Sequence, residues 1–153
     1  MRLLFPLFLC MAVIACNTKT SNNETSGNEA DKKQVAQAEE NMFNAIKTND
    51  SGFWKTVSDS YITINADGIM ANKQESINDS IRRKMFTGID HKLFDHTIKV
   101  FGNVGICNGR AQFFMQNQMF AEIYYTAIFR KENGNWIYEG WQGTMTKNNP
   151  RPA

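Results

Sequence analysis

The spacing of apolar residues changes after Gly88, and this change constrains the possible fold more than any other feature of the sequence. Before Gly88, apolar residues recur at helical spacing, most clearly over 32–48. After it they alternate along strand-like stretches that only short turns separate. The clearest turn is Asn133-Gly134, because a type I′ hairpin turn needs positive φ at both central residues. Helices first and a strand meander afterwards predict an α+β domain.

Three helices are expected before the meander. The first covers 32–48, and Asp50 or Ser51 can cap a second, short helix after the break that follows it. A third helix begins at Asn72, with Glu75 three residues later as in a capping box. The apolar stripe of the first helix consists of Val35, Ala38, Met42, Ala45 and Ile46.

A first short strand is expected at 61–65, between the second and third helices, because this stretch is β-branched and aromatic. The stretch 104–118 is either one long strand or two halves joined at Asn108-Gly109. The predicted fold is a curved antiparallel sheet wrapped over three N-terminal helices, in the order α-α-β-α-β-β-β-β. The strands of the meander are expected at 92–102, 104–118, 121–132 and 135–145.

The N-terminus is typical of an exported lipoprotein. Arg2 precedes an unbroken apolar run over 3–15, which is shorter than the roughly 20 residues that span a bilayer and indicates a signal peptide. Ala15-Cys16 resembles the end of a bacterial lipobox, in which the cysteine is lipidated and becomes the first residue of the mature chain. The alternative is an ordinary signal that is cleaved near Ala15. We expect a lipid on Cys16 and a bacterial membrane-anchored protein on the periplasmic or cell-surface side.

The chain then divides into four parts. Residues 1–15 are the lipoprotein signal peptide, and 16–31 are the lipidated cysteine and a flexible tether. The tether has no large apolar residue, so it cannot bury a core of its own. The stretch 32–147 is one folded domain, and 148–153 is a disordered tail.

Charge and cysteine content exclude several classes of function. The formal net charge is +2 and no basic run occurs, so we expect no nucleic-acid partner. Cys107 is the single cysteine of the folded domain, and we interpret it as a small buried apolar residue rather than a nucleophile. His91 and His96 are five apart, so they point to opposite faces of a regular strand and match no common zinc pattern. We therefore expect no metal and no cofactor.

Five stretches of the sequence carry a family resemblance across about 31–146. They are "KTND", "SDSYITINADG", "NKQESI", "VFGNVGICNGR" and "TAIFRKENGNWIYEGWQGT". In this order they resemble the nuclear transport factor 2-like superfamily, and more narrowly the SnoaL-like group and the domain of unknown function family 4440. The resemblance implies a cone-shaped α+β barrel, a pocket between sheet and helices, and homodimers that pack through the sheet.

The superfamily includes ketosteroid isomerases, and the resemblance allows their catalytic positions to be compared. These enzymes need a tyrosine in the first helix, an acidic base near the end of the first strand and an acid on a later strand. A gapless alignment places these positions at Met42, Ile64 and Ala127, none of which can transfer a proton. A slip by one residue would bring Thr63 or Asn65 inward, and neither is a good base.

The same alignment predicts which side chains face the pocket. If Ala127 faces inward, strand parity also puts Tyr125 inward, and on the last strand it puts Glu139 and Trp141 inside and Trp136 outside. The inward set then also includes Ile123, Phe129, Ile137 and Gly143, and the outward set Tyr138 and Gln142. The predicted ligand-pocket residues are Met42, Trp54, Ile64, Tyr125, Ala127 and Trp141.

Glu139 and His96 are the candidate acid–base residues. Glu139 would be the one carboxylate inside an apolar cone, where burial raises a carboxyl pKa; the alternative is a solvated carboxylate at the rim. His96 shares its parity with apolar neighbours, and its alternative is a hydrogen-bonded histidine of the core or rim. Tyr125 could donate a hydrogen bond to a ligand or to a core partner.

The sequence therefore predicts an exported, lipid-anchored domain that binds an unknown small apolar or amphipathic molecule without conventional catalysis. One alternative is an acid–base enzyme of isomerase, cyclase or hydrolase type. Another is a homodimeric assembly module whose cone is filled by side chains. A cavity of a few hundred Å³ would favour the binder or the enzyme over the assembly module.

Overall fold

The computed structural model describes residues 29–149. The predicted signal peptide, Cys16, most of the predicted tether and the last four residues lie outside these described residues. Helix α1 (Glu29–Thr48) begins inside the stretch that was predicted to be tether, so the folded domain starts slightly earlier than expected.

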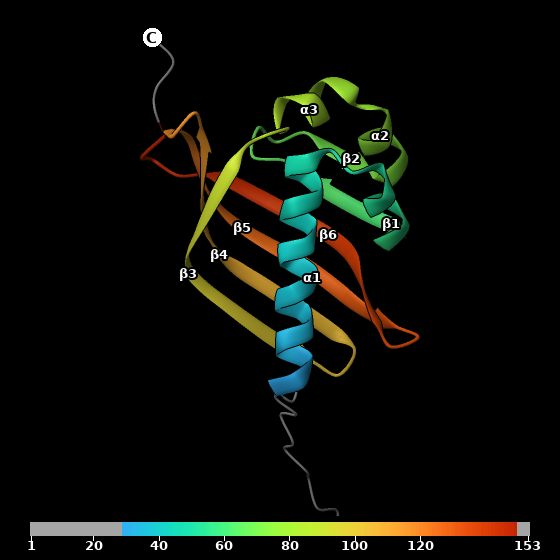
Figure 1. Ribbon diagram of the computed structural model, residues 1–153. Helices are drawn as coiled ribbons and strands as arrows, with labels where there is room; N and C mark the ends of the chain where they lie inside the picture. The colour runs from blue at the N-terminus through green and yellow to red at the C-terminus, as the bar shows by residue number, and fades with distance from the viewer. Residues whose placement is uncertain (1–28, 150–153) are drawn as a thin grey trace, which may run out of the picture.

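Helix α1 lies across one face of the sheet and forms the centre of the fold (Figure 1). Its inward side buries Val35, Glu39, Met42 and Phe43. Two residues of the predicted stripe, Val35 and Met42, are therefore buried, whereas Ala38 and Ala45 are half-buried and Ile46 is exposed. The helix can approach the sheet closely because Gly105 lies beneath it. A Cβ on Gly105 would lie 2.6 Å from a methyl carbon of Val35, too close for any larger residue without a shift of the helix.

The second expected helix is a short 3-10 helix, η1 (Ser51–Thr56), capped by Asp50, whose carboxylate accepts a hydrogen bond from the Gly52 amide at 2.8 Å. The expected third helix is two helices, α2 (Lys73–Asn78) and α3 (Ser80–Met85). The chain breaks at Asp79, because its carboxylate accepts from the Arg82 amide and starts a new helix. The predicted capping box at the start of α2 is confirmed.

Within the described residues the sheet has six strands in the order β2-β1-β6-β5-β4-β3. Strand β4 runs unbroken through Asn108-Gly109, and the hairpin at Asn133-Gly134 joins β5 to β6 as predicted. The strands are β1 (Val57–Ile64), β2 (Met70–Asn72), β3 (Asp90–Phe101), β4 (Val104–Met115), β5 (Gln118–Glu132) and β6 (Asn135–Met145). The predicted α+β architecture of a curved sheet packed on N-terminal helices is confirmed (Figure 1).

Two details of the predicted sheet are wrong. Strand β2 was not expected, and the sheet is mixed rather than antiparallel because β1 pairs with β6 in parallel. The hairpin fixes the direction of β6 against β5, and the other edge of β6 is then open. Strand β1 covers that edge and satisfies its backbone hydrogen bonds, whichever direction β1 runs.

Two β-bulges change which side chains face inward. In β3 the register shifts between Phe94 and Thr97, and Asp95 there has a φ of 53°. In β6 the register shifts at Glu139, because Tyr138 pairs with Phe129 and Gly140 pairs with Ile128. An extra residue in a strand reverses the parity of everything on one side of it.

The inward and outward faces predicted for the last strand are therefore wrong for the residues of β6 that precede the bulge. Trp136 and Tyr138 are buried in the core, where they were predicted to face outward. The indole nitrogen of Trp136 donates to the side-chain oxygen of Gln34 on α1 at 3.2 Å. Trp141 also faces inward, as predicted, so both tryptophans lie on the same face of β6.

Candidate functional site

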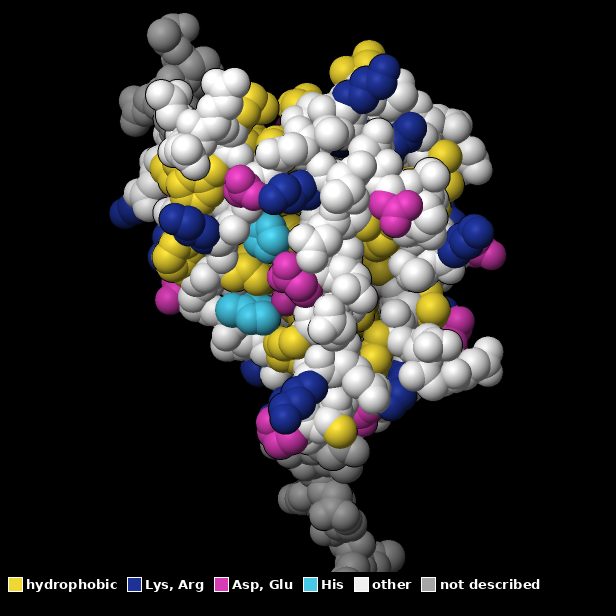
Figure 2. All heavy atoms as spheres, viewed as in Figure 1, with side chains coloured by type: hydrophobic (Ala, Val, Ile, Leu, Met, Phe, Trp, Pro, Cys, Tyr) yellow, Lys and Arg dark blue, Asp and Glu magenta, His cyan; other side chains and the backbone are white. Residues whose placement is uncertain are grey.

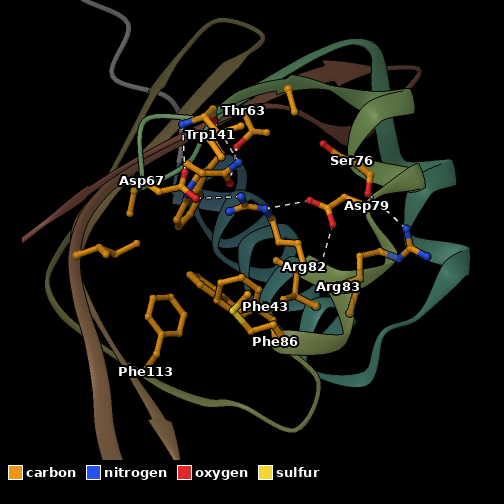
Figure 3. A pocket seen from close by; sticks show the side chains of 18 of the residues that line it. Phe43, Thr63, Asp67, Ser76, Asp79, Arg82, Arg83, Phe86, Phe113 and Trp141 are labelled. Atoms are coloured by element: carbon orange, nitrogen blue, oxygen red, sulfur yellow. Dashed lines mark hydrogen bonds and ion pairs between the residues drawn. The ribbon is translucent and has the colours of Figure 1, made fainter. Parts of the chain in front are cut away.

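A cavity of about 710 Å³ opens between the inner face of the sheet and the helices η1, α2 and α3. The C-terminal half of α1 contributes Phe43 and Ile46 to its wall. Figure 3 shows aromatic side chains converging on this space from the helices and from the sheet. Its size is that of a site for a small organic molecule.

One wall of the cavity is a stack of aromatic rings. The rings of Tyr125 and Trp141 are parallel to within 13°, with centroids 4.9 Å apart. Phe43 meets both rings edge to face, at 5.9 Å from Tyr125 and 6.0 Å from Trp141. Trp141 and Phe43 line the cavity, whereas Tyr125 lies behind them. Such contacts hold the wall in one geometry even though the cavity beside it is open.

Polar side chains gather at another part of the lining. Arg82 donates to Asp67 at 2.9 Å and to Asp79 at 3.2 Å, and all three residues line the cavity (Figure 3). The pKa of Asp79 is lowered, first by the hydrogen bond from the Arg82 amide and then by the guanidinium. Burial by itself raises the pKa of Asp67, but the Ile69 amide and Arg82 together lower it. Both carboxylates therefore stay ionised at neutral pH and are occupied by their own partners.

The structure brings some of the predicted pocket residues to the cavity and not others. Trp54 and Trp141 line it, whereas Met42 and Ala127 are completely buried in the core beside it. Ile64 faces outward and is exposed, because β1 is offset by one residue from the gapless alignment. Thr63 and Asn65 line the cavity in place of Ile64.

Glu139, one of the two candidate acid–base residues, lies outside the cavity lining. It sits in the β6 bulge, where it accepts hydrogen bonds from Ser60 at 2.5 Å and from Arg130 at 3.1 Å. Partial burial raises its pKa, but the serine hydroxyls and the guanidinium outweigh this and lower it overall. The predicted inward position of Glu139 is therefore wrong, because the bulge turns it to the other face.

His96, the other candidate, is also not part of the cavity lining. It lies in the β3 bulge and its Nε2 is 2.7 Å from Oε2 of Glu39 on α1. Gly109 lets β4 pack closely against this bulge, because a Cβ on Gly109 would lie only 3.2 Å from the Cα of His96. The Glu39 side chain is only 2% exposed, whereas that of His96 is 28% exposed.

Glu39 is the centre of a buried polar cluster that sequence reasoning missed. The Tyr125 hydroxyl donates to its Oε1 at 3.0 Å, and ligand atoms of Glu39, His96 and Cys107 all lie within 4.8 Å of one another. Burial raises the pKa of Tyr125 and of Cys107, and the Glu39 carboxylate raises both further. An acid on the buried stripe of α1, four residues after Val35, was the signal that could have identified this cluster.

The histidines and several acidic side chains gather on one face of the molecule, over β3 and α1 (Figure 2). His91 stacks on Phe43 with centroids 4.3 Å apart, and its Nε2 is 3.8 Å from Glu40. Burial lowers the pKa of His91, only partly offset by Glu40. The two histidines therefore have separate acidic partners and do not converge.

Solved structures with the same architecture are numerous, and three show the range. An NTF2-like protein from Cytophaga hutchinsonii is 16% identical, with a TM-score of 0.64 over 78% of this chain and 100% of that one. A candidate ketosteroid isomerase from Parabacteroides distasonis is 13% identical, with a TM-score of 0.63 over 82% of this chain and 95% of that one. A candidate calcium/calmodulin-dependent kinase II association domain from Exiguobacterium sibiricum is 11% identical, with a TM-score of 0.63 over 83% of this chain and 98% of that one.

The chain therefore has the NTF2-like fold, and the predicted resemblance to that superfamily is confirmed at the level of the fold. The narrower resemblance to the SnoaL-like group and to family 4440 stays a prediction. No protein-family model and no curated protein matches the sequence. In the part of the chain that the structure describes, no helix is long and apolar enough to cross a membrane.

Proposed function

We propose that the protein binds one small, mainly apolar molecule in its cavity and does not transform it. The observation that carries this proposal is an open space of about 710 Å³ whose wall is mainly apolar and includes nine aromatic residues of the described part of the chain. A cone filled by side chains would leave no such space, so the cavity speaks against the assembly module with a filled interior. Protein interiors are close-packed and rarely contain large voids. We therefore interpret an open apolar space of this size as a binding site.

The ligand is amphipathic in this proposal. Thr63, Asp67 and Arg82 lie at one side of the cavity, and Phe43, Phe86 and Phe113 lie at the other (Figure 3). A molecule with an apolar body and one polar end can satisfy both sides, because its body covers the rings and its polar end meets the charged group. A wholly polar ligand would leave the aromatic wall without a partner.

The absence of catalysis is supported by the state of the carboxylates that line the cavity. Asp50 caps η1, Glu75 closes the capping box of α2, and Asp67 and Asp79 hold Arg82. A general base must have a lone pair free to take a proton from the substrate, and each of these carboxylates already accepts hydrogen bonds from its own partner. Glu139 and His96, on which the enzyme alternative depends, are not among the lining residues.

A fluorescent probe tests the proposal. We expect the purified protein to bind 1-anilinonaphthalene-8-sulfonate saturably, with one probe per chain. Ala121 is buried at the cavity wall, so Ala121→Phe fills the cavity and should weaken binding by about tenfold or more, which is about 1.4 kcal/mol. Thr126→Phe adds the same ring on the outer face of the same strand and should leave binding unchanged. Equal binding by both variants would place the probe elsewhere.

We also propose that the chain is exported and anchored by a lipid on Cys16. The support is the apolar run over 3–15 and the Ala15-Cys16 pair that follows it. In a bacterium that expresses the full chain, wild-type protein should fractionate with membranes and Cys16→Ser should not. Identical fractionation of the two would support ordinary cleavage near Ala15.

We also propose that two copies of the chain pair through the outer face of the sheet. Ile62, Gly140 and Ile128 form one row across β1, β6 and β5, and Ile62 is 52% exposed. Tyr124, on the same face of β5, is 57% exposed. Exposed apolar rows on a sheet mark interaction surfaces. Light scattering should show a dimer that Ile128→Glu converts to a monomer, whereas a monomeric wild type would contradict the pairing.

A further inference from the structure

The cluster around Glu39 has the composition of a metal site and is separate from the cavity. A carboxylate, an imidazole and a thiol approach from three elements, α1, β3 and β4. Their ligand atoms lie within 4.8 Å of one another, and the Nε2 of His96 is already 2.7 Å from the carboxylate of Glu39. None of the three residues lines the cavity.

We propose that Glu39, His96 and Cys107 form a binding site for one transition-metal ion of the zinc class. Oxygen, nitrogen and sulfur donors together suit Zn²⁺, which is borderline in softness and accepts all three. Zinc binds such atoms at about 2.0–2.3 Å, which places tetrahedral donors roughly 3.3–3.8 Å apart. To reach that geometry, Nε2 of His96 and Oε2 of Glu39 must separate from 2.7 Å by about 0.6–1.1 Å, and the widest pair, which is within 4.8 Å, must close by about 1.5 Å or less.

The charges of the site balance when a dication is bound. Glu39 supplies one negative charge, and Cys107 supplies a second once its thiol proton has left to the solvent. His96 binds as a neutral imidazole through Nε2, with its remaining proton on Nδ1. A Zn²⁺ ion with these ligands has no net charge, which is the favourable state for a site whose acid and thiol are both buried.

The surroundings supply both an orienting group and a route for the ion. The Tyr125 hydroxyl holds Oε1 of Glu39, so Oε2, which contacts Nε2 of His96, is the oxygen that faces the metal once the ion replaces the proton between them. Hydrogen bonds of this kind fix the orientation of ligands in metal sites. The His96 side chain is 28% exposed, so the ion can enter from that side, and a water molecule can complete the coordination there.

Cobalt and zinc titrations test the site on the purified full chain after treatment with a chelator. We expect one Zn²⁺ per chain by calorimetry. We also expect Co²⁺ to give strong visible bands of a tetrahedral ion together with a sulfur-to-cobalt charge-transfer band. The charge-transfer band reports a thiolate ligand, and the Cys107→Ala variant, which keeps Cys10 and Cys16, shows which cysteine supplies it. Cys107→Ala should remove the band, and His96→Gln should weaken zinc binding by at least about 100-fold.

His91→Gln is the matched control, since it removes the other histidine of β3, which contacts Glu40 and not the cluster. It should bind zinc as the wild type does. Because Cys107 is buried, circular dichroism checks the fold of Cys107→Ala, and the partly exposed His96 provides a second variant that does not depend on core packing. The absence of zinc binding, a cobalt spectrum without the sulfur band, or equal affinity of wild type and His96→Gln would each overturn the proposal.

Discussion

The two interior regions of this domain lie on opposite sides of one pair of rings and have opposite character. On the Trp141 side the space is open, its wall is mainly apolar and rich in aromatic rings, and Arg82 is paired with Asp67 and Asp79. On the Tyr125 side the space is filled, and a hydroxyl and an imidazole converge on the buried carboxylate of Glu39. The stacked pair Tyr125–Trp141 belongs to both.

The difference separates what each region can do. An apolar cavity gains free energy by exchanging water for apolar surface, so it selects a ligand by size and shape. A buried polar cluster gains free energy only through specific hydrogen-bond donors and acceptors, so its stability is sensitive to the loss of any one of these atoms. The same fold therefore holds two neighbouring regions: a cavity that tolerates changes in its lining, and a polar cluster that does not tolerate the loss of a donor or acceptor.

The largest effect on the free energy of unfolding is expected in the polar cluster around Glu39. Glu39→Ala leaves the Tyr125 hydroxyl and the His96 imidazole without their shared acceptor, and should lower the free energy of unfolding by about 3–5 kcal/mol. Urea unfolding followed by circular dichroism measures this. Glu40→Ala removes a neighbouring, half-exposed acid of the same helix and should change it by about 0.5 kcal/mol or less. Similar losses for both variants would mean that Glu39 is no more than a surface-like acid.

A smaller effect is expected from the ring that faces the cavity. Trp141→Ala should cost about 2–3 kcal/mol, less than a fully buried tryptophan, because one side of the ring already faces open space. It should also weaken probe binding, since it removes part of the aromatic wall. Unfolding and fluorescence titration of one preparation measure both. A variant that keeps full probe affinity would show that this wall does not contact the probe.

Tyr125→Phe separates the two regions most sharply, because it keeps the ring and removes only the hydroxyl. Glu39 loses one donor, which should cost about 1.5 kcal/mol. Probe affinity should stay that of the wild type, since the stack on Trp141 remains. If the probe affinity falls with the stability, the cavity and the cluster are one coupled unit.

Glu122 is a second buried acid. In contrast to Glu39, we interpret its carboxylate as purely structural. Gln112, Thr146, Asn148 and Arg110 donate to it and lower its pKa from 4.5 to about 2. A depressed pKa contributes stability above the unfolded value, and this contribution is lost as the pH falls from 4.5 toward 2. Glu122→Gln should therefore lose stability at neutral pH and show a flatter stability profile over that acidic range in urea unfolding. An unchanged profile would contradict the assigned pKa.

These contacts also correct the predicted tail. The side chain of Asn149 accepts from the Glu122 amide at 2.6 Å and donates to the Glu122 carbonyl at 2.6 Å. Residues 148 and 149 are therefore attached to β5, although 148–153 was predicted to be disordered. Nothing in the composition of the tail indicates this, because the partner lies 27 residues away along the chain.

Local signals predicted what depends on neighbouring residues. The Asn133-Gly134 turn, the Asn72–Glu75 capping box and the first helix were all correct, since each depends on a few consecutive side chains. The parity of β6 failed because the bulge at Glu139 leaves no local mark, and one extra residue exchanged inside for outside. The prediction that Trp136 and Trp141 face opposite sides failed for the same reason.

The site was harder to predict than the fold because its parts come from distant elements. Glu39 and Tyr125 are 86 residues apart, and their contact depends on how α1 crosses the sheet. Trp54 and Trp141 were correctly predicted at the pocket, because large aromatic residues at inward positions are typical of an apolar pocket wall. Cys107 was interpreted alone, as a small buried apolar residue, and Glu39 was not singled out, because neither residue type by itself indicates a site.

Native mass spectrometry of the protein purified from its own source tests the central claim most directly, because one spectrum reports both regions. The account predicts a chain that carries one small organic molecule and one zinc ion. Ala121→Phe should lose the organic molecule and keep the metal, and His96→Gln should lose the metal and keep the organic molecule. A wild-type chain that carries neither, or variants that lose both together, would contradict two independent sites separated by the Tyr125–Trp141 stack.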